Sequence, residues 1–207
     1  MLDYFESIFC INLEHRPDRK QHALKEFEKI GIANRVEFIN AVYLKDRPAL
    51  GNHLSHAICI NKANKRGINN VLIFEDDVLF LDNALDTLIK AEDQLSHIDK
   101  WGLFYLGANL EQPCYQETEN LSRLTFAFST HAYAINRYLF DLLISINLDD
   151  SIAHNDVHMS NYIIPHFPCY IATPITAIQS PSYSDIEKRE VNYNWMIDRF
   201  NNNLVRK

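Results

Sequence analysis

The stretch that decides the fold is Asn70-Val71-Leu72-Ile73-Phe74-Glu75-Asp76-Asp77. Its first part, residues 70–74, is an apolar run of the kind found in a central parallel strand that is covered on both faces. The run stops abruptly at three consecutive acids, Glu75, Asp76 and Asp77. We therefore predict a buried strand over residues 70–74 with carboxylates at its carboxyl end.

Strands and helices alternate outward from this run. Short apolar runs predict further buried strands, and apolar residues at helical spacing predict helices that end at Gly31 and Gly67. The expected strands are 7–13, 36–39, 102–107 and one or two within 126–135. One expected helix ends at residue 30. The other expected helices cover about 50–66, 83–97, 138–146, 154–164 and the polar tail. The segment 108–122 is expected to be an irregular loop. This alternation predicts an α/β fold with a mostly parallel sheet flanked by helices on both faces, and no linker divides residues 1–207 into more than one domain.

Composition narrows the class of ligand. The chain has 207 residues, of which 47% are apolar and only five are glycine, and no Gly-rich phosphate loop is present. The formal net charge is −7 and no cluster of Lys and Arg forms a basic patch, so we expect no nucleic-acid partner. An acidic protein that binds a polyanionic nucleotide needs a cation between them, which favours a divalent metal.

Cysteine usage and hydropathy bear on the compartment. The four cysteines form no C-x-x-C pair, and we expect them to be reduced, buried thiols. No apolar run approaches the length of a membrane span, and the first residues carry early acids in place of a basic n-region. We therefore expect no transmembrane segment, no signal peptide and a cytoplasmic location.

Three acids at the end of a buried strand require compensation, because like charges so close raise one another's pKa. In open α/β sheets the ligand crevice lies at the carboxyl ends of the strands, where carboxylates suit Mg²⁺ or Mn²⁺. If the strand continues, Glu75 and Asp77 point to one face and Asp76 to the other. The alternative is that these acids cap a following helix.

Several motifs together resemble glycosyltransferase family 25, the lipooligosaccharide galactosyltransferases and their collagen-modifying relatives. They are Ile11-Asn12-Leu13-Glu14-His15-Arg16-Pro17-Asp18-Arg19, Gly51-Asn52-His53-Leu54-Ser55-His56, the run 71–77, and looser matches at 105–107, 130–135 and 179–186. The motifs occur in the family's order and cover most of the chain.

The resemblance implies a GT-A-like, Rossmann-like fold and a nucleoside-diphosphate-sugar donor, expected to be a UDP-sugar. It further implies Mn²⁺ (or Mg²⁺) dependence and transfer of a hexose, galactose or glucose, with inversion at the anomeric carbon, to a glycan or other hydroxyl acceptor. A second hypothesis is a catalytically inactive nucleotide-sugar-binding interaction module. A metal-dependent phosphoesterase ranks last, because it needs metal ligands at further strand ends.

Carried over residue by residue, the resemblance makes Asn12, Arg16, Arg19 and His56 donor-side groups, together with Glu75 and Asp76. Arginine suits a diphosphate through its forked donors. For Arg16 and Arg19 the alternative is a surface ion pair with Asp18 or Glu14.

The expected metal ligands are Asp77 and Glu75, with His158 (or His154) completing the shell. A structural role is the simpler interpretation of His53.

Inverting transfer needs a base that takes the proton of the acceptor hydroxyl. Asp156 resembles the late acid of the family, and we expect it to be this base, with Asp149 and Asp150 as substitutes. The alternative is that Asp156 caps a helix. The late motif Ser184-Asp185 is expected to close over the donor or to form an exposed turn.

Overall fold

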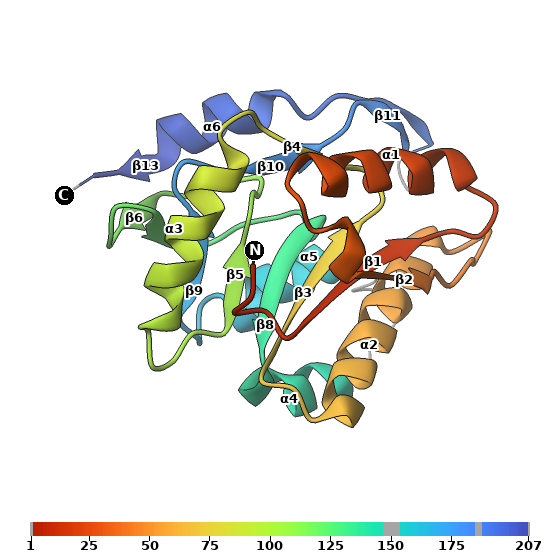
Figure 1. Cartoon of the computed structure of the whole chain (residues 1–207), viewed down its shortest axis with the longest axis horizontal. Coiled ribbons are helices and arrows are strands. Elements are labelled where there is room, and N and C mark those ends of the chain that lie inside the picture. The colour runs from red at the N-terminus through yellow and green to blue at the C-terminus, as the bar shows by residue number, and fades with distance from the viewer. Residues whose placement is uncertain (1, 147–153, 185–187, 207) are drawn as a thin grey trace.

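The computed structural model describes residues 2–146, 154–184 and 188–206 (Figure 1). The helices are α1 (Pro17–Lys29), α2 (Pro48–Arg66), α3 (Ala84–Ser96), α4 (Phe140–Ser145), α5 (Asn155–His158) and α6 (Trp195–Asn203), with shorter helical turns η1 (Ala33–Arg35), η2 (Arg137–Leu139) and η3 (Met159–Ile163). The strands are β1 (Ser7–Asn12), β2 (Val36–Asn40), β3 (Asn70–Glu75), β4 (Val78–Phe80), β5 (Leu103–Tyr105), β6 (Cys114–Gln116), β7 (Leu121–Arg123), β8 (Ala132–Asn136), β9 (Cys169–Ala172), β10 (Ala177–Gln179), β11 (Ser182–Ser184), β12 (Arg189–Val191) and β13 (Leu204–Val205).

Within these described ranges, nine strands form the main sheet in the order β13-β6-β7-β9-β5-β8-β3-β1-β2. Strands β2, β1 and β3 pair in parallel, as the sequence predicts for strands joined through helices. Strand β8 then runs antiparallel to both β3 and β5. The carboxyl ends of β1 and β3 therefore meet at one edge of the sheet, which is where the acidic run lies.

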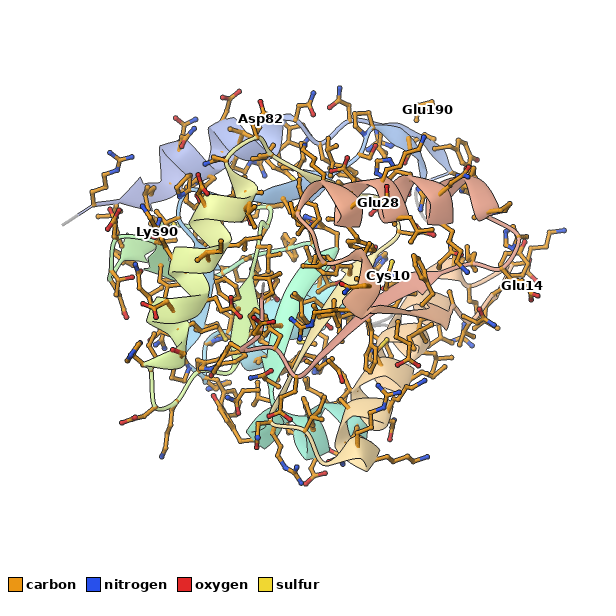
Figure 2. The ribbon with its side chains drawn as sticks, in the orientation of Figure 1. Cys10, Glu14, Glu28, Asp82, Lys90 and Glu190 are labelled. Atoms are coloured by element: carbon orange, nitrogen blue, oxygen red, sulfur yellow. The ribbon has the colours of Figure 1, made fainter. Side chains whose placement is uncertain are left out.

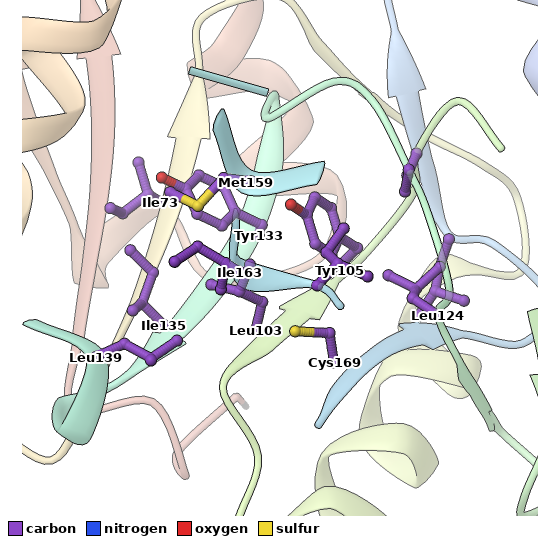
Figure 3. Packing of buried hydrophobic residues seen from close by; sticks show 14 of the residues in the cluster. Ile73, Leu103, Tyr105, Leu124, Tyr133, Ile135, Leu139, Met159, Ile163 and Cys169 are labelled. Atoms are coloured by element: carbon purple, nitrogen blue, oxygen red, sulfur yellow. The ribbon is translucent and has the colours of Figure 1, made fainter. Parts of the chain in front are cut away.

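The two faces of the sheet carry separate apolar clusters, because alternate residues of a strand point to opposite faces. Phe9 of β1 and Ile73 of β3 pack with residues of α2, whereas Cys10 and Phe74 pack with residues of α1 and α3. Figure 3 shows the first cluster, where side chains from β3, β5 and β8 meet Met159 from η3. Helices cover both faces, and the predicted α/β fold class is confirmed.

The cysteines lie in the interior of the protein, and most charged side chains lie on its surface. In Figure 2, Cys10 lies on β1 among the other ribbons and Glu190 lies at the upper edge of the molecule, while Glu28 is an exposed residue of α1. All four cysteines are free and buried, and burial raises the pKa of the Cys59 thiol to about 12. Among the described helices, none combines the length and the apolar character that a bilayer span requires.

Strands that the sequence analysis did not predict are short and lie beyond the acidic run. Strands β6 and β7 occupy part of the segment expected to be an irregular loop, and the antiparallel pairing of β7 with β9 holds them on the sheet. Strand β4 pairs with β10, a partner almost one hundred residues away. Strands of three residues carry too little periodicity to be recognised without their partners.

Gly107 is fixed by a close approach of two backbones. Next to it, the Leu106 carbonyl accepts a hydrogen bond of 2.8 Å from the Thr176 amide, and a Cβ at position 107 would lie 1.8 Å from the Ala177 carbonyl oxygen. Gly107→Ala is therefore expected to lower the free energy of unfolding by about 3 kcal/mol, since neither backbone can move aside without cost. Urea unfolding measures this.

The matched control is Gly67→Ala. Gly67 caps α2 with φ +71°, and among the described residues an added Cβ would meet only the Arg137 side chain, at 3.8 Å. That substitution is expected to cost about 1 kcal/mol through its left-handed conformation alone. Equal losses in the two variants would contradict the steric explanation for Gly107.

Candidate functional site

A cavity of about 120 Å³ lies at the carboxyl ends of β1 and β3. Its floor is polar and carries Asn12, Arg19 and the three strand-end acids, while its outer wall is formed largely by apolar residues that follow β2, namely Ala41, Val42, Tyr43, Leu44 and Pro48. The structure thus brings together most of the residues predicted to contact a donor.

The acidic run of residues 75–77, called the acidic turn below, begins at the last residue of a strand and continues as a turn. Strand β3 ends at Glu75, Asp76 and Asp77 form a turn, and β4 follows at Val78. The expected alternation of side chains therefore fails at this point, because Asp76 and Asp77 contact the same arginine while Glu75 faces helix α2. No helix follows directly, so helix capping does not explain these acids.

Arg19 of α1 is the cation that compensates the negative charge of the acidic turn. Its Nη1 lies 3.0 Å from Asp76 Oδ1 and 3.7 Å from Asp77 Oδ2, and the three side chains are largely buried. Its Nη2 donates to Ser182 Oγ and to the Tyr183 carbonyl, each at 3.0 Å. Arg19 therefore ties the acidic turn to β11, near the carboxyl end of the chain.

Asn12, the last residue of β1, fixes the orientation of Asp76. Its side-chain amide donates to Asp76 Oδ2 at 2.7 Å and to the Arg16 carbonyl at 3.1 Å. Burial raises the pKa of Asp76, against the opposing effects of Arg19 and Asn12. Both oxygens of this carboxylate thus have partners within the protein.

Asp77 differs from Asp76 because one of its carboxylate oxygens has no hydrogen-bond partner among the described residues. Within the described part of the chain, Oδ1 is buried without a hydrogen-bond partner, and Oδ2 has only the distant Arg19 and the Gln179 amide at 3.5 Å. Burial, followed by the charge of Glu75, raises the pKa of Asp77 to about 7. A buried carboxylate in this condition is suited to take up a proton or to bind a cation.

This raised pKa predicts how stability depends on pH. Between an ordinary value of 3.8 and about 7, folded Asp77 holds a proton that the unfolded chain has released, so its contribution to stability falls as the pH rises. Asp77→Asn is expected to remove this loss, so that the variant gains on the native protein between pH 4.5 and 7, by at most about 4 kcal/mol. Urea unfolding across this range measures the difference.

Asp82→Asn is the control, because Asp82 is an exposed acid close by in the sequence. Its stability should follow that of the native protein at every pH. A constant difference between Asp77→Asn and the native protein across the range would contradict a raised pKa at Asp77.

Glu75 is held by a buried chain of polar groups. His56 Nε2 lies 3.1 Å from Glu75 Oε1, and His56 Nδ1 lies 3.1 Å from the Tyr133 hydroxyl. Burial opposes ionisation of Glu75, but hydrogen bonding and charge from His56, with a hydrogen bond from Asn52, lower its pKa overall. Because the carboxylate can only accept, His56 donates from Nε2 to Glu75.

The acidic turn partly fits a divalent cation. Hard cations take carboxylate oxygens, and Asp77 Oδ1 is the one turn oxygen that is buried without a partner in the described structure. Mg²⁺ in such sites binds through one or two carboxylates together with phosphate oxygens, so a full protein cage is not required. Within residues 2–146, 154–184 and 188–206, no group of three or more His, Cys, Asp and Glu side chains is arranged to hold a metal ion.

His158 is not brought to this turn. It lines a small separate cavity with His53 and Asn155, between α5 and α2, and its ring stacks on Tyr162 at 4.9 Å. The expected grouping of His158 with Glu75 and Asp77 is therefore absent from the described residues, because packing of α5 against α2 turns His158 toward His53.

Arg16 also lies apart from the donor-side residues. It pairs with Asp18 at 2.9 Å on the surface, which is the alternative interpretation of this arginine, and its hydrogen bonds lower the pKa of Asp18 to about 2. Among the described residues that line the strand-end cavity, Arg19 is present and Arg16 is not. Among the described contacts of the two arginines in this motif, those to the acidic turn are made by Arg19.

A second cavity, of about 530 Å³, adjoins the first and contains Asp156. The two cavities share Asn52, Glu75, Gln179 and Ser184 as lining residues. Asp156 lies in the first turn of α5, accepts a hydrogen bond from the Ser129 amide at 3.0 Å, and is only partly buried. It does not occupy the N-cap position of the helix, so capping does not account for it.

Some site residues could not be predicted from the sequence. Tyr133 and Gln179 occur in motifs that resemble the family but carried no assigned role. Strand pairing of β8 brings Tyr133 to His56, and strand pairing of β10 brings Gln179 to Asp77. Asn52 follows a Gly of the helix motif and gave no signal of its own. The alternative bases Asp149 and Asp150, and Asp185 of the late motif, lie outside the described residues.

Comparison with known sequences supports one family. Residues 48–140 match the model described as glycosyltransferase family 25 (LPS biosynthesis protein). The chain is also 28% identical over 162 residues to the human protein named inactive glycosyltransferase 25 family member 3, and 28% identical over 135 residues to the rat protein named probable inactive glycosyltransferase 25 family member 3. These alignments cover 63% and 53% of this chain but 27% and 24% of the relatives, so the chain spans about a quarter of their length. The predicted resemblance to family 25 is confirmed.

Comparison with solved structures supports the fold. A glycosyltransferase involved in glycosylation of the major capsid of PBCV-1 superposes with a TM-score of 0.55, covering 95% of this chain and 97% of that one at 9% identity. A UDP-glucose pyrophosphorylase complexed with UDP-glucose superposes with a TM-score of 0.51, covering 95% of this chain and 80% of that one at 6% identity. At these identities the likeness shows the fold alone, and the predicted GT-A-like fold is confirmed.

Proposed function

From the match of residues 48–140 to glycosyltransferase family 25, and from the geometry of the acidic turn, we propose that this chain transfers a sugar from a nucleoside-diphosphate-sugar donor to a hydroxyl acceptor. The observation that carries the proposal is Asp77, a buried carboxylate with a raised pKa. One of its oxygens has no hydrogen-bond partner among the described residues, and Asp77 lies at the strand ends where α/β folds bind their ligands. The donor is a UDP-hexose, and residues 1–207 act as one glycosyltransferase domain.

The first cavity holds the nucleotide end of the donor. Tyr43 is 58% exposed at its rim, where a ring is available to a base, and Asn12 marks the end of β1 on its floor. Arg19 lies between the floor and β11, and its guanidinium is suited to a diphosphate as well as to Asp76. Asn12 and Arg19 are two of the residues that the resemblance assigns to the donor side, and their position in this cavity supports the proposal.

Mn²⁺ or Mg²⁺ bound by Asp77 and Glu75 would supply charge neutralisation for the departing diphosphate. The chain's own residues orient that site, since His56 and Asn52 direct the Glu75 carboxylate and Arg19 holds Asp76. Asp156, in the adjoining cavity, accepts the proton of the acceptor hydroxyl as it attacks the sugar from the face opposite the diphosphate, which inverts the anomeric carbon.

A second candidate is a nucleotide-sugar-binding module without catalysis. Two relatives at 28% identity are named inactive or probable inactive family members, which favours keeping this alternative. The two functions share the first cavity and differ in whether Asp156 affects turnover.

Thermal unfolding with UDP, with and without Mn²⁺, tests the donor site. A ligand at a hundredfold its dissociation constant adds about 2.7 kcal/mol to the stability of the folded state. UDP is expected to raise the melting temperature only with Mn²⁺ present, and Asp77→Ala is expected to abolish the rise.

Asp82→Ala serves as the control and should respond like the native protein, since Asp82 is exposed and lies outside both cavities described above. Absence of a response to UDP, GDP, CMP and dTDP alike, with and without Mn²⁺, would sink the proposal. A response to UDP that needs no Mn²⁺ would remove the metal from it.

A further inference from the structure

Helix α5 carries Asp156, but the helix is too short to fix the position of this residue on its own. It covers four residues, Asn155–His158, which is about one helical turn. Most of the stability of a helix in a protein comes from packing against its neighbours, and this holds most strongly for so short an element. The contacts of α5 with its neighbours therefore decide where the Asp156 carboxylate lies.

One of these neighbours is α2. His53 Nδ1 lies 3.3 Å from Asn155 Oδ1, and both side chains are buried. Because an amide oxygen can only accept, His53 donates from Nδ1. Among the described residues, this is the one hydrogen bond between a side chain of α2 and a side chain of α5. His158 lies at the same interface, but both of its ring nitrogens are buried without a hydrogen-bond partner in the described structure.

Apolar packing alone leaves this interface loose. The small cavity between α2 and α5 has a volume of about 10 Å³, which is room for about one water molecule. Ile60 and Met159 line it, and apolar contacts of this kind are non-directional. They oppose separation of the two helices but do little against sliding of one along the other. The hydrogen bond from His53 is directional, so it fixes the register of α5 on α2.

The same turn of α2 also holds the donor side of the site. Asn52 Nδ2 and His56 Nε2 lie 3.2 Å and 3.1 Å from Glu75 Oε1, and His53 lies between these two residues in the sequence. One stretch of α2 thus contacts Glu75 with two side chains and α5 with a third. Glu75 and Asp156 both line the second cavity, and α2 is the common frame that sets the spacing between them.

We propose that His53 is a positioning residue for Asp156. It donates to Asn155, the residue before Asp156, and so holds the Asp156 carboxylate at a fixed place relative to Glu75. His53 is not among the described residues that line the two adjoining cavities, so it acts through Asn155 rather than by contact with a ligand. This inference rests on the proposed function, in which Asp156 is the base.

A backbone amide holds Asp156 from another side. The Ser129 amide donates to Asp156 Oδ2 at 3.0 Å, and Ser129 is held at φ +73°, a conformation that is uncommon for a residue other than glycine. The carboxylate thus has one anchor on its own oxygen and a second, through His53, on the residue before it. Loss of His53 should shift Asp156 without releasing it, so we expect a partial loss of rate.

His53→Leu, which removes the donor, is expected to lower kcat for sugar transfer about 10- to 100-fold, because a misplacement of about 1 Å at a reacting group costs about 10²-fold. The rate is measured as UDP release from a UDP-hexose. The KM for the UDP-hexose and the stabilisation by UDP should keep their native values, since the groups around the first cavity are unchanged.

Two further variants separate positioning from a general effect on the helix. His53→Asn should restore most of the rate, because its amide nitrogen is bonded to Cγ, as Nδ1 of histidine is, and can donate to Asn155. Ile58→Ala is the matched control and should show the native rate, since Ile58 is an exposed residue of the same helix. Should His53→Leu fail to fold, His53→Ala takes its place, because alanine has the highest helix propensity.

The decisive measurement combines His53→Leu with Asp156→Asn. If His53 acts through Asp156, the two losses do not multiply, and the double variant should lie within about threefold of Asp156→Asn alone. A residue that only stabilises the fold would instead add its own loss to that of Asp156→Asn and would weaken the stabilisation by UDP.

Two results would overturn the inference alone. One is a native kcat for His53→Leu in a series in which Asp156→Asn loses activity. The other is a double variant whose loss equals the product of the two single losses. Full activity of Asp156→Asn, or no turnover by the native protein, would instead overturn the proposed function and this inference with it. Because all variants are measured in one series, the two kinds of failure are distinguished.

Discussion

Asp156→Asn is expected to lower the rate of sugar transfer by about 10²–10⁴-fold while leaving stabilisation by UDP unchanged. Asp156 lines the second cavity and has no contact with the acidic turn among the described hydrogen bonds and ion pairs. An amide in its place keeps the size of the side chain and can still accept from the Ser129 amide, but it cannot take a proton. The loss should therefore appear in kcat.

UDP release from a UDP-hexose, with and without an acceptor sugar, measures this effect. Asp93→Asn is the control, because Asp93 is an exposed acid on α3, remote in the fold from both cavities, and its rate should match the native one. Full activity of Asp156→Asn would remove Asp156 as the base. If the native protein binds UDP yet no UDP-hexose is turned over, the non-catalytic binding module becomes the better description.

Arg19→Gln is expected to lower the free energy of unfolding at pH 7.5 by about 3 kcal/mol, because it leaves buried carboxylates without their cation. Arg19 lies 3.0 Å from Asp76 and 3.7 Å from Asp77, and its side chain is 15% exposed. The loss should shrink at pH 5, where Asp77, whose pKa is already raised, takes up a proton.

Urea unfolding at the two pH values measures the effect of Arg19→Gln, and Arg16→Gln is the matched control. Arg16 belongs to the same motif and pairs with Asp18, whose side chain is 64% exposed, and loss of this exposed pair should cost less than about 1 kcal/mol. Mn²⁺ at pH 7.5 is expected to restore part of the stability lost at Arg19. A loss that is equal at pH 5 and pH 7.5 would show that packing, rather than charge, explains it.

The sequence predicts the first half of the fold well because its signals there are local. The apolar run that ends at Glu75 and the helix that ends at Gly67 are both present within a residue or two of their expected bounds. Strands β6, β7 and β9 were missed because pairing with distant segments, rather than their own pattern, makes them strands. The antiparallel direction of β8 likewise depends on its neighbours β3 and β5.

The candidate site divides in the same way. Asn12, Arg19, His56 and the strand-end acids were expected on one site, and the structure places them in contact. Which of these residues contact one another was not predictable, because the chain turns at Asp76 and brings both aspartates to one arginine. The structure places His158 in a cavity with His53, away from the acids. The sequence could not predict this, because a single sequence does not show which face of α5 packs on α2.

The lining residues shared by the two cavities constrain how this chain can diversify. Asn52, Glu75, Gln179 and Ser184 border both spaces, so a substitution at any of them alters the surroundings of both ligands together. Selection for a new acceptor would damage the donor space if it worked through these positions. Tyr193 and Trp195 line the second cavity and not the first, so substitutions there leave the surroundings of the first cavity unchanged. Related chains that differ in acceptor preference should therefore vary at positions such as Tyr193 and Trp195 and keep the four residues that border both cavities.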